Sequence, residues 1–421
     1  MGCAKNVVDS EKLIAQLRLN SIEVVAAVED ADIAIVNTCG FIQAAKEESL
    51  DTIFDQVKRK ARGKLKRVYA MGCLTERYKS ALQREIPEVD RLFGSNEAAA
   101  ILQELGGRLR TELLGERVLT TPSHTAFLKI SEGCDNPCSF CAIPLMRGGH
   151  ASRPVESILE EATALAAGGV RELVVIGQDT TYYGLDRTGT RTLAALLERL
   201  AEIPGISWVR LMYAFPAKFP LDVLDVIRDH PRICRYIDMP IQHSADAVLK
   251  SMRRGVTGRS LRELIDTIRA RVPGITLRTT LIVGYPDEGI AEFEDLLRFV
   301  GETRFERLGV FTYSEEEGTT AAPLGDPIAP AEKARRRDAV MELQQEISDE
   351  RNAGLVGSTQ TVLIDRHEGG YAVGRTEADA PEVDNEVIVH GRHLPAVGTF
   401  SRIDIVEAYE YDLVGHLHNA S

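Results

Sequence analysis

The chain has 421 residues, of which 44% are hydrophobic and 27% charged, so we expect two or three domains with buried cores. No apolar run approaches the roughly 18 residues of a membrane-spanning helix, and no leader pattern opens the chain, so we expect a cytoplasmic protein without membrane contacts. The net charge of −13 argues against a general nucleic-acid binder, and the odd number of seven cysteines argues against a disulfide scaffold.

The first segment, residues 1–108, alternates apolar runs with helical patterns and holds three widely separated cysteines. Runs at 31–36 and 66–71 predict strands, and helical patterns follow at 44–60 and 75–86. This alternation predicts a parallel sheet, whose ligands gather beyond the carboxyl ends of its strands. Cys39 and Cys73 follow the two strands and Cys3 precedes a helical stretch, so the three thiols are candidates for one metal-cluster site. The alternative is that they are isolated buried cysteines.

Residues 108–122 have the composition of a linker, and residues 123–350 repeat a strand and a helix six times. Strands are predicted at 126–131, 172–178, 208–214, 235–242, 276–284 and 307–313, and helices at 155–167, 193–202, 221–229, 260–271 and 290–300. Six such units predict an open (β/α)6 partial barrel, with its site at the carboxyl ends of the strands. Gln178, His243 and Gly284 lie at such ends, although a lone histidine there is more often structural. Cys234 begins a strand, and we expect it to be structural.

Three further cysteines lie within eight residues, directly after the first strand of this barrel. The sequence Cys134-Asp-Asn-Pro-Cys138-Ser-Phe-Cys141 has the spacing C-x₃-C-x₂-C. A 4Fe–4S cluster normally takes four cysteines, so three leave one iron open to a substrate or cofactor. The alternative is a zinc site with His124 as the nearest fourth ligand, in a non-catalytic RNA-binding module.

After a predicted helix at 331–352, the texture of the sequence changes. Short alternating runs at 359–365, 370–375, 386–390, 399–407 and 409–413 predict a small antiparallel β-barrel over residues 354–417. Residues 355–421 carry eleven acidic and four basic residues, a net charge of −7, which would repel nucleic-acid phosphates. We expect an exposed acidic loop here that binds a basic partner. Its candidate binding residues are Glu377, Asp379, Glu382 and Asp384.

The three parts together resemble the methylthiotransferase family of radical S-adenosyl-L-methionine (SAM) enzymes over essentially the whole chain. Gly2-Cys-Ala-Lys-Asn-Val-Val-Asp-Ser10, Asn37-Thr-Cys-Gly-Phe41 and Gly72-Cys-Leu74 match the amino-terminal domain of that family. The cysteine loop, followed by Ala142-Ile-Pro-Leu-Met-Arg-Gly148, matches its radical SAM motif, and the tail resembles a TRAM domain.

Within the family, three segments are similar to the branch that methylthiolates the β-carbon of an aspartate in small ribosomal subunit protein twelve. They are Gly2-Cys-Ala-Lys-Asn6, Gln178-Asp-Thr-Thr-Tyr-Tyr-Gly184 and Ala378-Asp-Ala-Pro-Glu-Val-Asp384. The alternative is the branch that methylthiolates adenosine in transfer RNA, which predicts a basic tail.

The resemblance implies two 4Fe–4S clusters, one of which cleaves SAM to a radical while the other presents sulfur. The first would be held by Cys134, Cys138 and Cys141, and the second by Cys3, Cys39 and Cys73. Phe140, Gln178 and Gly284 are the expected SAM contacts. The expected partners are a basic small-subunit ribosomal protein as substrate and a low-potential electron donor such as flavodoxin or ferredoxin, and the protein is expected to be a monomer.

Overall fold

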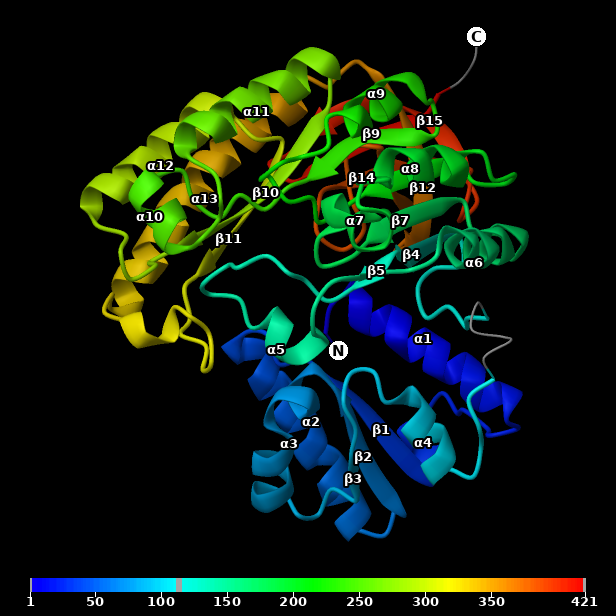
Figure 1. The fold of residues 1–421 in the computed structure, drawn as a ribbon. Coiled ribbons are helices and arrows are strands. Elements are labelled where there is room, and N and C mark those ends of the chain that lie inside the picture. The colour runs from blue at the N-terminus through cyan, green and yellow to red at the C-terminus, as the bar shows by residue number, and fades with distance from the viewer. Residues whose placement is uncertain (1, 111–115, 419–421) are drawn as a thin grey trace.

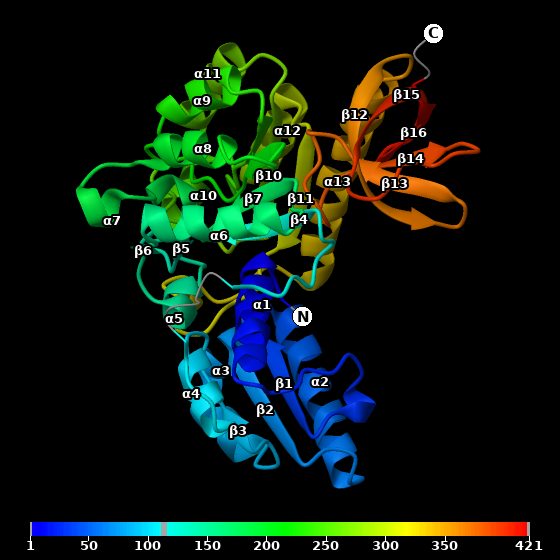
Figure 2. The same ribbon diagram turned by 90° about the vertical axis from the view of Figure 1, so that its right-hand side faces the viewer.

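The computed structural model describes residues 2–110 and 116–418, which form three bodies (Figure 1). A parallel α/β domain, a partial barrel and a small closed β-barrel follow one another along the chain. The closed barrel lies beside the partial barrel, and α5 (Ile143–Arg147) lies between the partial barrel and the amino-terminal domain (Figure 2). Residues 111–115 of the predicted linker lie outside the described residues.

The amino-terminal domain has the predicted parallel sheet, in the strand order β1-β2-β3. Its elements are α1 (Ala4–Leu19), β1 (Ile33–Thr38), α2 (Gln43–Ala61), β2 (Arg67–Gly72), α3 (Cys73–Glu85), β3 (Arg91–Leu92) and α4 (Ala98–Glu104). Helix α1 belongs to two cores, because Leu13 and Leu17 pack on this sheet while Val8 packs inside the partial barrel. The first turn of α1 therefore reaches from one domain into the other.

The partial barrel is one parallel sheet in the order β11-β10-β9-β8-β7-β4, and its edge strands β4 and β11 leave it open. The strands are β4 (Thr125–Lys129), β7 (Glu172–Ile176), β8 (Trp208–Leu211), β9 (Ile233–Asp238), β10 (Thr276–Val283) and β11 (Arg307–Thr312). Its outer helices are α6 (Val155–Ala167), α8 (Leu193–Ala201), α9 (Asp222–Asp229), α11 (Gly258–Arg271), α12 (Ile290–Thr303) and α13 (Pro330–Ala353). Side chains alternate across each strand: Leu128 packs under the helices, whereas Phe127 and Val174 face the interior.

Shorter elements follow the carboxyl ends of the barrel strands. They are the hairpin-like pair β5 (Ser131–Glu132) and β6 (Ala151–Ser152), and the helices α7 (Leu185–Thr188) and α10 (Asp246–Ser251). None of the helices in residues 2–110 and 116–418 is long and apolar enough to cross a membrane.

The carboxy-terminal part is a closed five-stranded barrel in the order β12-β13-β14-β16-β15. Its strands are β12 (Thr359–Glu368), β13 (Tyr371–Arg375), β14 (Glu386–His390), β15 (Phe400–Ala408) and β16 (Asp412–Leu417). Four of the pairings are antiparallel, as in the antiparallel barrel predicted, and β14 and β16 run parallel. An odd number of strands cannot alternate direction all the way round a closed barrel, so one parallel pair is required.

Candidate active site

The loop that carries Cys134, Cys138 and Cys141 is held by backbone hydrogen bonds at both ends. The Cys134 amide donates to the Gly148 carbonyl at 3.1 Å, and the Ser139 amide donates to the Met252 carbonyl at 3.0 Å. Burial raises the pKa of the Cys134 thiol to about 11 and that of Cys141 to about 12. Without a cationic ligand these thiols are therefore protonated at neutral pH, and a bound metal centre would deprotonate them.

Two side chains donate hydrogen bonds to sulfurs of this loop. Nη1 of Arg254 lies 3.1 Å from the Cys138 sulfur, and Nδ2 of Asn136 lies 3.4 Å from the Cys134 sulfur. Arg254 is 4% exposed, and its guanidinium lies 4.2 Å from the ring centroid of Phe215. Donors of this kind stabilise thiolates, which fits a negatively charged iron–sulfur centre.

The structure brings the other three predicted ligands to one edge of the amino-terminal sheet. Cys39 follows β1, Cys73 begins α3 and Cys3 immediately precedes α1. Burial raises the pKa of the Cys73 thiol to about 11, Arg147 opposes this rise, and the nearby Cys3 and Cys39 add to it. Among the described residues, no three cysteine, histidine or carboxylate side chains are close enough to hold one metal ion. Ligands of a four-iron cluster bind different irons and so lie farther apart.

Arg147 of α5 connects this second cysteine set to the barrel. Its Nε donates to the Cys73 sulfur at 3.2 Å, and its two Nη atoms donate to Asp9 and Asn6, both at 2.6 Å. Reasoning from sequence did not single out Arg147, although it lies in the motif that follows the cysteine loop. The motif was therefore a signal for Arg147 itself but not for its contacts with Asn6, Asp9 and Cys73, which are more than 70 residues away in the chain.

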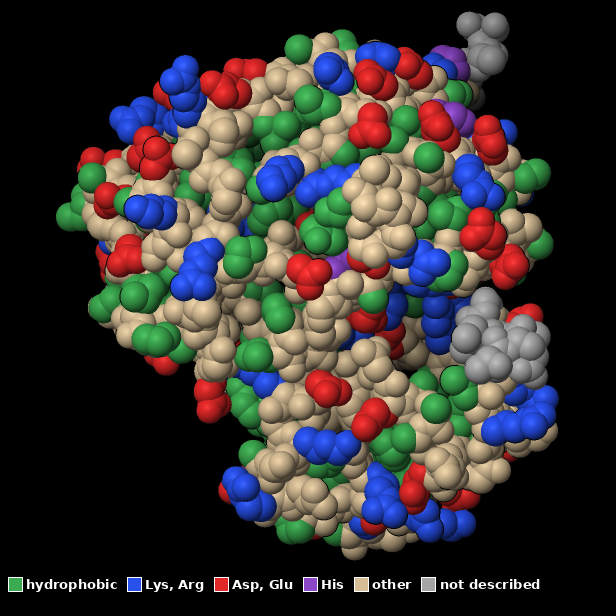
Figure 3. Space-filling view, viewed as in Figure 1, with side chains coloured by type: hydrophobic (Ala, Val, Ile, Leu, Met, Phe, Trp, Pro, Cys, Tyr) green, Lys and Arg blue, Asp and Glu red, His purple; other side chains and the backbone are tan. Residues whose placement is uncertain are grey.

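The network continues to the carboxyl ends of the barrel strands. Lys129 contacts both Asp9 and Glu132, the latter at 2.7 Å, and Nε2 of Gln178 donates to Glu132 at 2.8 Å. In the space-filling view, acidic and basic side chains gather in a hollow between the barrel and the amino-terminal domain (Figure 3). The two cysteine sets thus flank one polar mouth.

Three buried oxygens near this mouth have no hydrogen-bond partner among the described residues. They are Oε1 of Gln178, Oε1 of Gln242 and Oγ of Ser131. Buried polar atoms are normally satisfied, so these atoms are suited to a polar ligand such as SAM. Gln242 also has a φ of 76°, a left-handed conformation that is uncommon outside glycine and often marks functional sites.

Two of the predicted SAM contacts also have structural roles. Phe140 is half-buried against Tyr285, Tyr313 and Met252 behind the cysteine loop. Gly284 has a φ of 75°, and a Cβ there would lie 2.2 Å from the side chain of Lys333, so only glycine fits.

The acidic loop, residues 376–385, is only partly exposed. Glu377 and Glu382 are exposed, but Asp379 is 1% exposed and the side chain of Asp384 2%. The expectation of four exposed binding residues is therefore wrong for the two aspartates. Their side chains turn into the interior of the partial barrel near the amino ends of its strands, where they contact arginines and a tyrosine.

The reason is the charge of that interior. Asp379 pairs with Arg307 at 2.6 Å, and Asp384 accepts hydrogen bonds from Tyr236 at 2.6 Å and from Arg278 at 3.2 Å. Buried arginines need counter-ions, and this loop supplies them.

The remaining candidates are buried and make contacts within the fold. His124 is buried at the start of β4, at the end opposite the cysteine loop, and its Nε2 lies 2.9 Å from Asp365, so it is not a fourth metal ligand. His243 is fully buried, which lowers its pKa to about 4, and its Nδ1 accepts from the Ala245 amide. Cys234 is 1% exposed in the barrel interior, as predicted for a structural cysteine.

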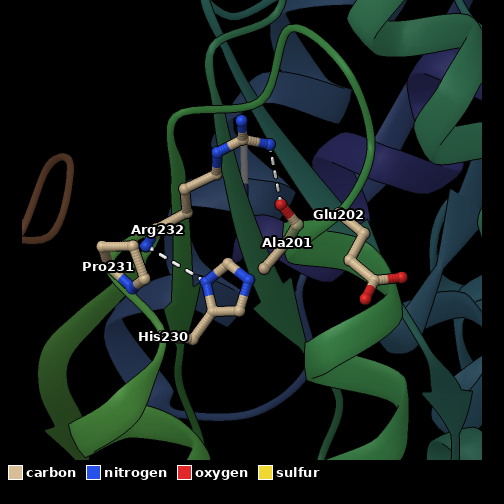
Figure 4. Close-up of a pocket in the computed structure, with 5 residues that line it drawn as sticks. All are labelled: Ala201, Glu202, His230, Pro231 and Arg232. Atoms are coloured by element: carbon tan, nitrogen blue, oxygen red, sulfur yellow. Dashed lines mark hydrogen bonds between the residues drawn. The ribbon is translucent and has the colours of Figure 1, made fainter.

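A surface hollow of about 390 Å³ lies away from this mouth (Figure 4). Its lining includes Ala201, His230 and Arg232, at the amino end of β9. The side chain of Arg232 donates to the Ala201 carbonyl, and the Arg232 amide donates to the His230 ring. No cysteine lines it, so it is not part of the candidate active site.

Known proteins match the chain over its full length. Residues 1–94 match Uncharacterized protein family UPF0004, residues 128–300 the Radical SAM superfamily and residues 356–417 the TRAM domain. A ribosomal protein uS12 methylthiotransferase RimO of Chloroherpeton thalassium is 52% identical over 421 residues, which cover 99% of this chain and 97% of that protein. The chain belongs to the RimO family. A RimO of Cytophaga hutchinsonii is 50% identical and covers 99% of this chain and 96% of its own.

The predicted family and three-part fold are thus confirmed. Among solved structures, the radical SAM methyltransferase TsrM of Kitasatospora setae covers 87% of this chain and 76% of its own, with a TM-score of 0.52 and 14% identity. The cobalamin-dependent SAM radical enzyme OxsB has a TM-score of 0.51 at 14% identity, and this chain spans 53% of its length. At these identities the two structures support the fold alone.

Proposed function

We propose that this protein adds a methylthio group to the β-carbon of an aspartate in ribosomal protein uS12. The observation that carries the proposal is the pair of cysteine sets on either side of one polar mouth, joined through Arg147, in a chain about half identical to RimO proteins over its length. A reaction that needs a radical source and a sulfur source requires both near one substrate atom.

The residues present fit two 4Fe–4S clusters. Cys134, Cys138 and Cys141 would hold one and Cys3, Cys39 and Cys73 the other, within domains of residues 123–350 and 1–108. When bound, the first cluster and SAM supply a 5′-deoxyadenosyl radical, and the second carries the sulfur. Arg254, Asn136 and Arg147 donate hydrogen bonds to the ligand sulfurs and so stabilise their charge.

The same mouth has the groups to bind SAM. The unpartnered oxygens of Gln178 and Gln242 can accept hydrogen bonds from its amino and ribose groups. Phe140 and Gly284, beside the cysteine loop and at the end of β10, complete the proposed contacts. The network through Glu132 holds Gln178 in place.

The charge of the carboxy-terminal domain, residues 354–417, favours a basic protein as substrate. Residues 355–421 have a net charge of −7, and Glu377 and Glu382 remain exposed for contact. The alternative substrate, adenosine in transfer RNA, would meet an acidic surface that repels its phosphates. We further propose cytoplasmic action as a monomer, with flavodoxin or ferredoxin as the reductant.

Mass spectrometry of uS12 from a deletion strain tests this proposal. The protein from the parent strain should carry one methylthio group on an aspartate, and the protein from the deletion strain should not. Restoring the gene should restore the group, whereas a Cys138→Ala variant should not. Unchanged uS12 in the deletion strain, together with loss of a methylthio group from transfer RNA, would favour the alternative.

A further inference from the structure

Within residues 2–110 and 116–418, Lys5 is a buried cation without an anionic partner. It lies in the first turn of α1, which is inserted into the barrel, and it is 7% exposed. Its Nζ lies 2.9 Å from the ring centroid of Tyr213. Among the described residues it has neither a carboxylate nor a hydrogen-bond partner.

The neighbouring cations differ from Lys5 in this respect. Lys129 contacts Asp9 and Glu132, and Arg147 contacts Asp9. Burying an ammonium group away from water is costly unless it is paired, and an aromatic ring compensates only in part. The position of Lys5 is also unfavourable for a cation, because the amino end of a helix carries partial positive charge and α1 has no acidic residue in its first turn. An anion at this point would remove both costs.

Tyr213 fixes where that anion would lie. It follows β8 at the carboxyl end of the barrel with a φ of 60°, which is a strained conformation for a bulky residue. Its amide donates to Asp238 at 3.1 Å, and its carbonyl accepts from the Thr180 amide at 3.0 Å. The Lys5 ammonium is therefore held at the barrel mouth, two residues after Cys3.

We propose that Lys5 binds the side-chain carboxylate of the substrate aspartate and so places its β-carbon between the two cysteine sets. The inference rests on the proposed function, because that carboxylate is bonded directly to the carbon to be modified. A cation at this position selects aspartate over asparagine, which has the same shape without the charge. The carboxylate of SAM has the same chemistry and is the competing source.

A binding cycle between Lys5 and the substrate carboxylate tests the proposal. Two labelled uS12 peptides, one with the target aspartate and one with asparagine in its place, are bound to the iron-loaded protein and followed by fluorescence anisotropy. The parent protein should prefer the aspartate peptide by about tenfold or more. Lys5→Met should bind the two peptides equally, with unchanged affinity for the asparagine peptide, and Lys5→Arg should keep the preference.

Lys12→Met is the matched control, because Lys12 lies on the same helix with Glu161 as its own partner at 3.1 Å. It should keep the preference. Samples are matched for iron content, and Lys5→Gln serves if Lys5→Met loses iron. A preference that survives in both Lys5 variants overturns the proposal.

SAM affinity, measured in parallel by equilibrium dialysis, separates the two carboxylates. Affinity for SAM should not change in Lys5→Met. A loss of SAM affinity with the peptide preference intact would assign Lys5 to SAM and overturn the proposal. Methylthiolation of the aspartate peptide by the parent protein is scored separately, and its absence would instead overturn the proposed function.

Discussion

In each cysteine set, one sulfur accepts a hydrogen bond from an arginine. Arg254 donates to Cys138, and Arg147 donates to Cys73. A cationic donor stabilises the more negative, reduced state of an iron–sulfur cluster and so raises its reduction potential. Arg254→Gln should therefore lower the potential of the cluster that we propose at Cys134, Cys138 and Cys141, and leave that of the second proposed cluster unchanged. Arg147→Gln should lower the potential of the cluster proposed at Cys3, Cys39 and Cys73 and leave that of the first unchanged.

Potentiometric titration of the electron paramagnetic resonance signals would measure both proposed clusters in one sample. Each variant is the control for the other, and Arg147→Lys should retain part of the effect. If either variant shifted both potentials equally, the assignment of one arginine to each cluster would be wrong.

At the residue scale, the sequence predicted where the candidate ligand cysteines lie better than the residues that contact them. Cys39 and Cys73 follow strands directly and Cys134 lies two residues after β5, so local patterns place them at strand ends. The contacts of Arg147 and Lys5 join segments that are far apart in the chain, and only the folded topology brings those segments together. Sequence patterns carry no signal for such pairings.

Among the elements, the loop at 376–385 differs most from its prediction. An acidic, proline-containing segment is typical of an exposed loop, yet Asp379 and Asp384 fill the barrel interior. Their partners Arg278 and Arg307 lie on predicted strands, where nothing in the sequence indicates an inward-facing positive charge. The strands and helices themselves followed from hydrophobic periodicity, because each has one buried side.

The two kinds of acidic residue in this loop should respond differently to substitution. Asp379→Asn leaves Arg307 buried without a counter-ion, so the free energy of unfolding should fall by about 3–5 kcal/mol. Glu382 is exposed, so Glu382→Gln should change the free energy of unfolding by no more than about 0.5 kcal/mol. Urea unfolding compares the two, and equal effects would contradict the buried placement of Asp379.

The interface between the two barrels should weaken in acid. Burial alone raises the pKa of Glu172, but Arg375 and Arg210 outweigh it and hold the pKa below its ordinary value. The ion pairs of Glu172 with the two arginines therefore stabilise the fold at pH values above about 4.3, the pKa of a glutamate in the unfolded chain. This contribution is lost as the pH falls through the lower pKa of Glu172 in the folded protein.

Trp208 reports on this interface, because it is the only tryptophan and its ring lies 4.7 Å from that of Phe400. Its emission should shift to longer wavelength as pH falls below about 4. The pH dependence of this emission shift should differ between Glu172→Gln and the parent protein. An identical acid transition in that variant would exclude Glu172 as its cause.

At the scale of the whole molecule, buried ion pairs fix the amino-terminal domain against the barrel. Glu316, after β11, pairs with Arg77 at 2.6 Å and Lys46 at 2.8 Å, and Arg147 pairs with Asp9. The two cysteine sets nonetheless lie at the edges of two different sheets. Each should therefore bind iron without the other.

Replacing Cys134, Cys138 and Cys141 with alanine should remove about half of the iron and abolish SAM cleavage. Replacing Cys3, Cys39 and Cys73 should also remove about half of the iron but leave SAM cleavage intact. Iron analysis and chromatography of 5′-deoxyadenosine measure the two properties. Full iron content in the second variant would contradict the two-cluster arrangement.

The most direct test of the central claim offers both substrates to the iron-loaded protein in one anaerobic reaction. The mixture contains uS12, unmodified transfer RNA, SAM, a sulfur source and a low-potential reductant, and both products are analysed by mass spectrometry. We expect one methylthio group on an aspartate of uS12 and none on the RNA. Modification of adenosine with unchanged uS12 would contradict it.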